Sequence, residues 1–139
     1  MSEESRYDNV DGEGLTVLVV DDERITRTIF ERKLVNKPYS IVTRSDAQAA
    51  LEFIEHNDIA VLVSDNQMPG MLGSELIKQV AQCYPTTARI FMSASEGPDA
   101  CPQTDIYLRK PFNNGALAEA VDSGIEIYVR RAEHARKRE

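Results

Sequence analysis

An apolar run that ends at a single carboxylate and a turn constrains the fold of this chain most strongly. The run 61–64 leads into Asp65, and Met68-Pro69-Gly70 interrupts the chain shortly afterwards. A short apolar run bounded by turn residues is typical of a strand that is buried on both faces of a parallel sheet. In open α/β sheets, ligands bind just beyond the carboxyl ends of such strands. We therefore expect Asp65 to lie, held firmly and yet accessible, at the edge where the strands end, called here the carboxyl edge.

Other strand-like runs alternate with helical patterns along the chain. Apolar residues recur at helical spacing after the first run, at Ile25, Ile29, Phe30 and Leu34, and Ser45-Asp46-Ala47-Gln48 fits a capping box at the start of the next helix. Such alternation predicts βαβ units, so the fold class is α/β with a doubly wound five-stranded parallel sheet and helices on both faces. The four additional strands are expected at Leu15–Val20, Tyr39–Thr43, Ala88–Met92 and Asp105–Arg109.

Length and charge narrow the class of protein. The 139 residues suffice for one domain, and a net charge of −7 argues against nucleic-acid binding, which needs a basic surface. No apolar run approaches the ~20 residues that span a bilayer, and the N-terminus lacks the apolar core of a signal peptide. Cys83 and Cys101 form no C-x-x-C pair and are expected as reduced thiols. We therefore expect a cytoplasmic protein with no membrane contact.

The charge pattern divides the chain into three parts. Residues 1–14 are acidic and polar and are expected to form a flexible leader. Residues 15–128 hold the predicted strands and helices, and residues 129–139 form a basic, helix-permissive extension. Two interpretations of this extension stay open: a solvated helix end favoured by cations near its C-terminus, or a signalling helix that leads to an effector domain.

The predicted strand ends bring polar residues to one edge. The first strand is followed by Asp21 and Asp22, the third ends at Asp65, the fourth ends at Ser93, and Lys110 follows the fifth. Carboxylates that gather this closely repel one another unless a cation offsets them, and Mg²⁺ suits such oxygen ligands. A carboxylate can also act as a nucleophile on phosphorus, with a lysine and a hydroxyl contacting the phosphoryl oxygens. The set therefore predicts phosphoryl transfer to a carboxylate.

These residues and their spacing resemble a receiver domain of a two-component response regulator. The resemblance covers about residues 15–128 and rests on four motifs. It implies the sheet order 2-1-3-4-5 and a phosphoryl donor that is a histidine kinase or a phosphotransfer protein. The matching motifs are Asp21-Asp22-Glu23, Asp65 with Met68-Pro69-Gly70 and Gly73, Ser93-Ala94, and Tyr107 with Lys110-Pro111-Phe112.

The resemblance also implies a role for each site residue. Asp65 would be the phospho-acceptor and would bind Mg²⁺ together with Asp22 and the Gln67 carbonyl, while Asp21 would act mostly through water. Ser93 would hydrogen-bond the phosphoryl group, and Lys110, before a cis bond to Pro111, would pair with it. Tyr107 occupies the position of the family's switch aromatic; the alternative is an edge-strand aromatic that covers the sheet.

One connection departs from the family pattern. Between Ser93 and the strand at Asp105 lie eleven residues, which include Gly97, Pro98 and Pro102. A helical crossover needs about a dozen residues or more, and these residue types oppose a continuous helix. We therefore expect the family's fourth helix to be shortened or absent. Three consequences stay open: the surface that the family uses for output lies elsewhere in this chain, the 94–104 loop itself carries the signal, or this is a mobile loop that carries Cys101.

Several functions stay open at this stage. The leading hypothesis is a signalling switch rather than an enzyme, with output through contact with an effector domain or partner protein; a homodimer is left open. A phosphatase with an aspartyl nucleophile would need a second Asp two residues later, where Gln67 stands. A flavin- or nucleotide-binding module would need a phosphate-binding loop after the first strand. The last alternative is a non-phosphorylated receiver-like interaction module.

Overall fold

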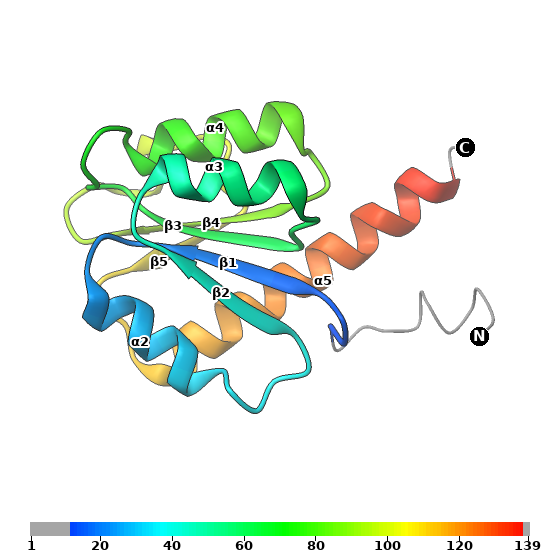
Figure 1. The fold of residues 1–139 in the computed structure, drawn as a ribbon, viewed down its shortest axis with the longest axis horizontal. Helices are drawn as coiled ribbons and strands as arrows, with labels where there is room; N and C mark the ends of the chain where they lie inside the picture. Colours follow the sequence, from blue (N-terminus) through cyan, green and yellow to red (C-terminus); the bar gives the residue numbers. More distant parts are fainter. Residues whose placement is uncertain (1–11, 138–139) are drawn as a thin grey trace.

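The computed structural model describes residues 12–137 and shows an α/β sandwich (Figure 1). Strands and helices alternate along the chain, as the sequence predicts. In order they are β1 Thr16–Val20, α2 Arg24–Lys33, β2 Ser40–Arg44, α3 Ala47–His56, β3 Val61–Asp65, α4 Gly73–Cys83, β4 Ala88–Ser93, the 3₁₀ turn η1 Pro98–Ala100, β5 Ile106–Arg109 and α5 Asn114–Lys137.

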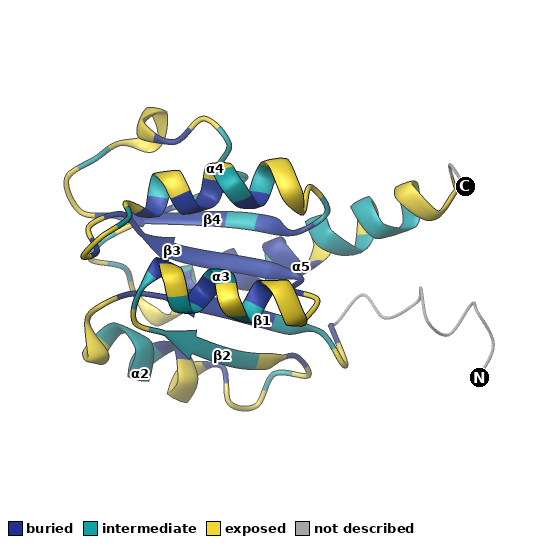
Figure 2. Cartoon of the chain, turned by 45° about the horizontal axis from the view of Figure 1, so that its top comes forward, coloured by how far each residue is buried: buried dark blue, intermediate teal, exposed yellow. Residues whose placement is uncertain are grey.

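The five strands form one parallel sheet in the order β2-β1-β3-β4-β5. Helices α3 and α4 cover one face of the sheet, and α2 and α5 cover the other (Figure 1). This arrangement confirms the predicted fold class and strand order. Because both faces are covered, the central strands have no polar face, and every residue of β3 is buried (Figure 2).

Side-chain alternation divides the core into two clusters. Along β1, Val17 and Val19 join the cluster beneath α2 and α5, while Leu18 and Val20 join the cluster beneath α3 and α4. Successive residues of a strand point to opposite faces, so one apolar run supplies both clusters. The sheet is therefore fixed from both sides, and its carboxyl edge is held in a defined position.

The connection between β4 and β5 has no α-helix. It contains only the 3₁₀ turn η1, as predicted from Gly97, Pro98 and Pro102. The Cys101 side chain is buried in the cluster beneath α3 and α4, where its thiol lies 3.8 Å from the Ser74 carbonyl oxygen. The small Cys101 side chain therefore contributes to the core on the face of the sheet that α3 and α4 cover.

One local expectation was wrong, and one side chain differs from its neighbours in burial. Ile25 lies in α2 at helical spacing from the buried Phe30 and Leu34, as expected, but its side chain is 74% exposed. At the start of α3 the capping residue is Asp46 and not Ser45: the Asp46 carboxylate accepts a hydrogen bond from the Ala49 amide at 2.8 Å. A carboxylate at this position also interacts favourably with the positive end of the helix dipole.

Helix α5 extends well past the sheet (Figure 1). The Asn113 side chain caps its first turn by accepting a hydrogen bond from the Ala116 amide at 2.7 Å. Further along, the Arg131 guanidinium donates to the Asp105 carboxylate at 2.5 and 2.9 Å, so the start of the basic extension contacts the folded body. Most of the predicted leader lies outside the described residues. Within residues 12–137, no helix is long and apolar enough to cross a membrane.

Candidate functional site

The strand register aligns the carboxyl ends of four strands. Val20 of β1 pairs with Ser64 of β3, and Asp65 pairs with Met92 of β4. Ser93 pairs with Arg109, the last residue of β5, and the following residue, Lys110, donates its backbone amide to the Ser93 carbonyl at 2.9 Å. Residues that are far apart in sequence therefore meet at the carboxyl edge, as the sequence predicts.

Asp65 is held by a close approach between β3 and α4. The Gly73 amide donates to the Asn66 carbonyl at 2.9 Å, and a Cβ atom at Gly73 would lie only 1.8 Å from the Asp65 carbonyl oxygen. That carbonyl also accepts a hydrogen bond from the Ser64 hydroxyl at 2.9 Å. Gly70, with φ of 86°, forms the turn between β3 and α4. The backbone of Asp65 is thereby fixed, and its carboxylate is directed to the carboxyl edge.

Lys110 joins the carboxylates of Asp21 and Asp65 at this edge, and its Nζ atom also lies 3.8 Å from Glu23 Oε1. Its Nζ atom lies 2.9 Å from Asp21 Oδ2 and 3.0 Å from Asp65 Oδ1. Burial raises the pKa of Asp65, and the neighbouring Asp21 charge adds to this effect in spite of the hydrogen bond from Lys110. Burial alone would lower the pKa of Lys110, but its hydrogen bonds to the two carboxylates outweigh burial and raise it. At neutral pH the lysine is therefore charged.

The donor set fits a divalent cation with hard oxygen ligands. Ligand oxygens of Asp21, Asp22 and Asp65 all lie within 4.8 Å of one another. Asp21 is fully buried, and its other carboxylate oxygen accepts the Glu23 amide at 2.9 Å, whereas Asp22 is exposed. Asp65 therefore has a firmly held carboxylate (Asp21) and an accessible one (Asp22) beside it. Mg²⁺ is typically bound by one or two such carboxylates and keeps several waters as its other ligands.

Glu96 is a site residue that sequence reasoning missed. The Ser93 hydroxyl donates to Glu96 Oε2 at 2.5 Å, and the Glu96 amide donates back to Ser93 Oγ at 2.8 Å. The Gln67 side-chain amide donates to Glu96 Oε1 at 2.6 Å. The hydrogen bonds from Ser93 and Gln67 lower the pKa of Glu96 to about 2. An acidic residue three positions after a strand-end serine can reach its hydroxyl within one turn, and that spacing was the available signal.

Tyr107 is half-buried beside the same segment. Its hydroxyl donates to the Glu96 carbonyl oxygen at 2.6 Å, and its ring lies 6.2 Å from that of Phe91. The Lys110-Pro111 peptide bond is cis, as the resemblance implies. A depression of about 300 Å³ opens in front of Asp65, and the residues that line it are Asp22, Glu23, Asp65, Gln67, Ala94, Ser95, Glu96 and Lys110.

Comparison with known proteins identifies the family. Residues 17–122 match the model of the response regulator receiver domain, which covers most of the chain. The chain belongs to this receiver family. It is 33% identical over 115 residues to the DNA-binding transcriptional regulator NtrC of Klebsiella pneumoniae, a match that covers 79% of this chain and 24% of NtrC. It is 30% identical over 128 residues to the transcriptional regulatory protein FixJ of Bradyrhizobium diazoefficiens, covering 88% of this chain and 60% of FixJ.

Solved structures show the same receiver fold. The chemotaxis response regulator CheY4 of Vibrio cholerae aligns with a TM-score of 0.72 and 26% identity, over 79% of this receiver and 98% of CheY4. The signal receiver domain of an HD domain-containing protein from Pseudomonas fluorescens aligns with a TM-score of 0.79 and 24% identity, over 86% and 92% of the two chains. The receiver spans about a quarter of the length of NtrC, so the match concerns one domain of that relative.

Proposed function

We propose that this receiver accepts a phosphoryl group on Asp65. A carboxylate oxygen of Asp65 attacks the phosphorus of the donor, the bond from phosphorus to the donor's leaving atom breaks, and an aspartyl phosphate forms. The observation that carries this proposal is the position of the Asp65 carboxylate, which lines an open depression and lies 3.0 Å from Lys110 Nζ. The lysine ammonium would stay close to the transferred group and offset its charge.

The remaining residues of the carboxyl edge take defined roles in this proposal. Asp21, Asp22, Asp65 and the Gln67 carbonyl would hold Mg²⁺, which supplies positive charge to the phosphoryl oxygens when bound. Asp21 orients Lys110 from its buried position. The Ser93 hydroxyl would donate a hydrogen bond to a phosphoryl oxygen, with Tyr107 as the switch residue.

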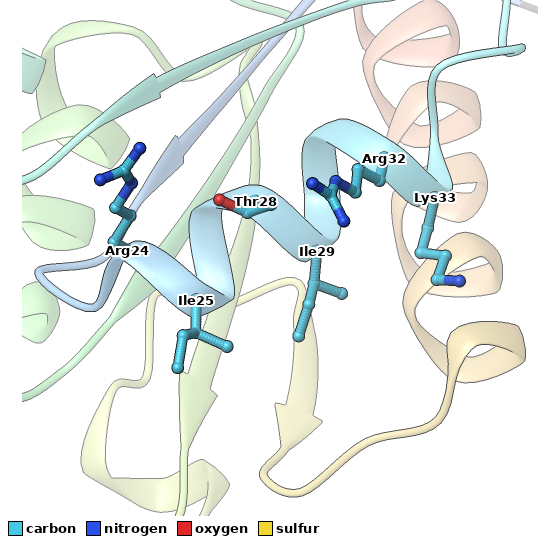
Figure 3. A pocket seen from close by; sticks show the side chains of 6 residues that line it. All are labelled: Arg24, Ile25, Thr28, Ile29, Arg32 and Lys33. Carbon is cyan, nitrogen blue, oxygen red and sulfur yellow. The ribbon is translucent and has the colours of Figure 1, made fainter.

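The surface of α2 supports a protein as the phosphoryl donor. Helix α2 begins three residues after Asp21, at the carboxyl edge, and Ile25 in its first turn is 74% exposed. Ile25 and Ile29 point to the same side of α2, and Arg24 and Arg32 extend from the same helix (Figure 3). Exposed apolar side chains with cations on the same helix suit a docking helix that has a mixed apolar and acidic face. We propose that a histidine kinase or phosphotransfer protein docks here, in the cytoplasm.

A mass measurement tests the acceptor. Intact protein would be mixed with acetyl phosphate, with Mg²⁺ and with a chelator, as wild type, as Asp65→Asn and as the matched control Asp58→Asn. Asp58 is exposed and precedes β3 at the opposite end of the strand, so this control makes the same charge change away from the carboxyl edge. The proposal predicts one Mg²⁺-dependent phosphoryl group on the wild type and on Asp58→Asn, and none on Asp65→Asn. Equal labelling of all three proteins would refute it.

A further inference from the structure

Glu96 forms the centre of a hydrogen-bonded group, called here the Glu96 network, beside the proposed acceptor. Its carboxylate accepts hydrogen bonds from Ser93, Gln67 and Ser95, at 2.5, 2.6 and 3.2 Å. Its main-chain carbonyl accepts the Tyr107 hydroxyl at 2.6 Å. All these interactions come from a single residue in the short connection between β4 and β5, the one that lacks an α-helix.

The Glu96 network and a phosphoryl group require the same donor. A serine hydroxyl has one O–H and can donate one strong hydrogen bond at a time. In the structure the Ser93 hydroxyl donates it to Glu96 Oε2. Ser93 is buried and Glu96 lines the depression in front of Asp65, so a phosphoryl group on Asp65 would also meet the Glu96 carboxylate as a like charge. The two anions therefore exclude each other from the Ser93 hydroxyl.

We propose that Glu96 is a positioning residue that occupies the Ser93 hydroxyl before phosphorylation and must leave it when Asp65 is modified. The inference rests on the proposed function of Asp65. It assigns to Glu96 a restraint on the rate of phosphorylation, because the transferring phosphoryl group gains the Ser93 hydrogen bond only after the carboxylate has left.

The same displacement reaches Tyr107. Its hydroxyl donates to the Glu96 main-chain carbonyl at 2.6 Å and lies 3.4 Å from the Ser93 carbonyl oxygen. The Glu96 amide also donates to Ser93 Oγ at 2.8 Å, so a phosphoryl group that takes over Ser93 disturbs this bond as well. The backbone that carries the Glu96 carbonyl is then released, and Tyr107 loses its strongest acceptor. Glu96 thereby connects the acceptor to an aromatic side chain on β5, across a connection in which η1 is the only regular element.

The test measures the rate constant of phosphorylation by acetyl phosphate with Mg²⁺, by intact mass, in Glu96→Ala, Glu96→Gln and Asp99→Ala. Asp99 is an exposed acidic residue of the same connection, so its removal controls for charge. We expect Glu96→Ala to raise the rate constant about threefold to tenfold, the range given by one hydrogen bond of modest net strength. Glu96→Gln should fall between it and wild type, because a neutral acceptor binds the hydroxyl more weakly. Asp99→Ala should match wild type.

A double-mutant cycle separates a role through Ser93 from a general effect of charge. In a Ser93→Ala background, Glu96→Ala should raise the rate constant much less than in the wild type, because only the repulsion between the two anions is then relieved; an equal rise in both backgrounds would overturn the proposal. As a second readout, the amide NMR signal of Tyr107 in unphosphorylated Glu96→Ala should shift toward its position in the phosphorylated wild type. If the wild type is labelled but Glu96→Ala has the same rate constant as the wild type, only the proposed role of Glu96 is overturned. Failure of wild type to be labelled overturns both proposals.

Discussion

The ion pair between Asp105 and Arg131 makes part of the basic extension a structural element of the domain. Arg131 donates to both carboxylate oxygens of Asp105, and the Arg89 amide donates to Oδ2 at 2.9 Å. The Asp105 side chain is 14% exposed and that of Arg131 33% exposed. Burial alone raises the pKa of Asp105, but the hydrogen bonds from Arg131 and Arg89 outweigh it and hold the pKa below its ordinary value.

Replacement of Arg131 with Met should destabilise the fold because it leaves the largely buried Asp105 carboxylate short of two hydrogen bonds. Charge-assisted hydrogen bonds contribute about 1.5–3 kcal/mol when buried, and partial exposure of Arg131 reduces this, so we expect a loss of about 2 kcal/mol. For a domain of this length such a loss corresponds to a fall in Tm of about 6 to 12 °C. Urea and thermal unfolding, followed by circular dichroism, would measure both quantities.

Arg130→Met is the matched control for this variant. Arg130 is exposed on the same helix and carries the same side chain, so its replacement should change the free energy of unfolding by no more than about 0.5 kcal/mol. Because the pKa of Asp105 is depressed in the folded state, its contribution is present at neutral pH and is lost as the pH falls through the folded pKa. The difference between wild type and Arg131→Met should therefore shrink in acid. Equal stability of Arg130→Met and Arg131→Met would refute the argument.

Two further predictions concern the carboxyl edge. Gly73→Ala places a Cβ atom against the Asp65 carbonyl, so it should lower the free energy of unfolding by about 1–3 kcal/mol and slow phosphorylation. Urea unfolding and intact mass would measure the two effects. Gly97→Ala is the control because its added Cβ atom meets open space, and equal effects of the two substitutions would contradict the steric argument. Asp65→Asn removes one of the clustered negative charges, so in the presence of a chelator it should raise the free energy of unfolding by about 1 kcal/mol. Added Mg²⁺ should raise the Tm of the wild type but not that of this variant. An equal response of both proteins to Mg²⁺ would place the ion elsewhere.

The sequence predicts the sheet and its edge because both depend on local pattern. The apolar run before Asp65 fits a strand that is buried on both faces of an α/β sheet, and parallel strands bring their carboxyl ends to one edge. The absence of an α-helix after β4 is predictable for the same reason, because Gly97, Pro98 and Pro102 oppose a continuous helix at their own positions in the chain.

Other features depend on tertiary contacts that leave no periodic signal. Ile25 has helical spacing to core residues, but the direction in which α2 packs on the sheet leaves it in solvent. The pairing of Arg131 with Asp105 joins residues 26 positions apart, and nothing in either local sequence indicates it. Glu96 lies in an irregular loop, where side-chain contacts follow from the path of the backbone and not from a repeat.

The most direct test of the central claim is the location of the phosphoryl group. Reduction of an aspartyl phosphate with borohydride converts the modified aspartate to homoserine, which peptide mass spectrometry assigns to a position. After treatment with acetyl phosphate and Mg²⁺, the account predicts homoserine at position 65 and at no other aspartate. Homoserine at Asp21 or Asp22 instead, with Asp65 intact, would contradict it.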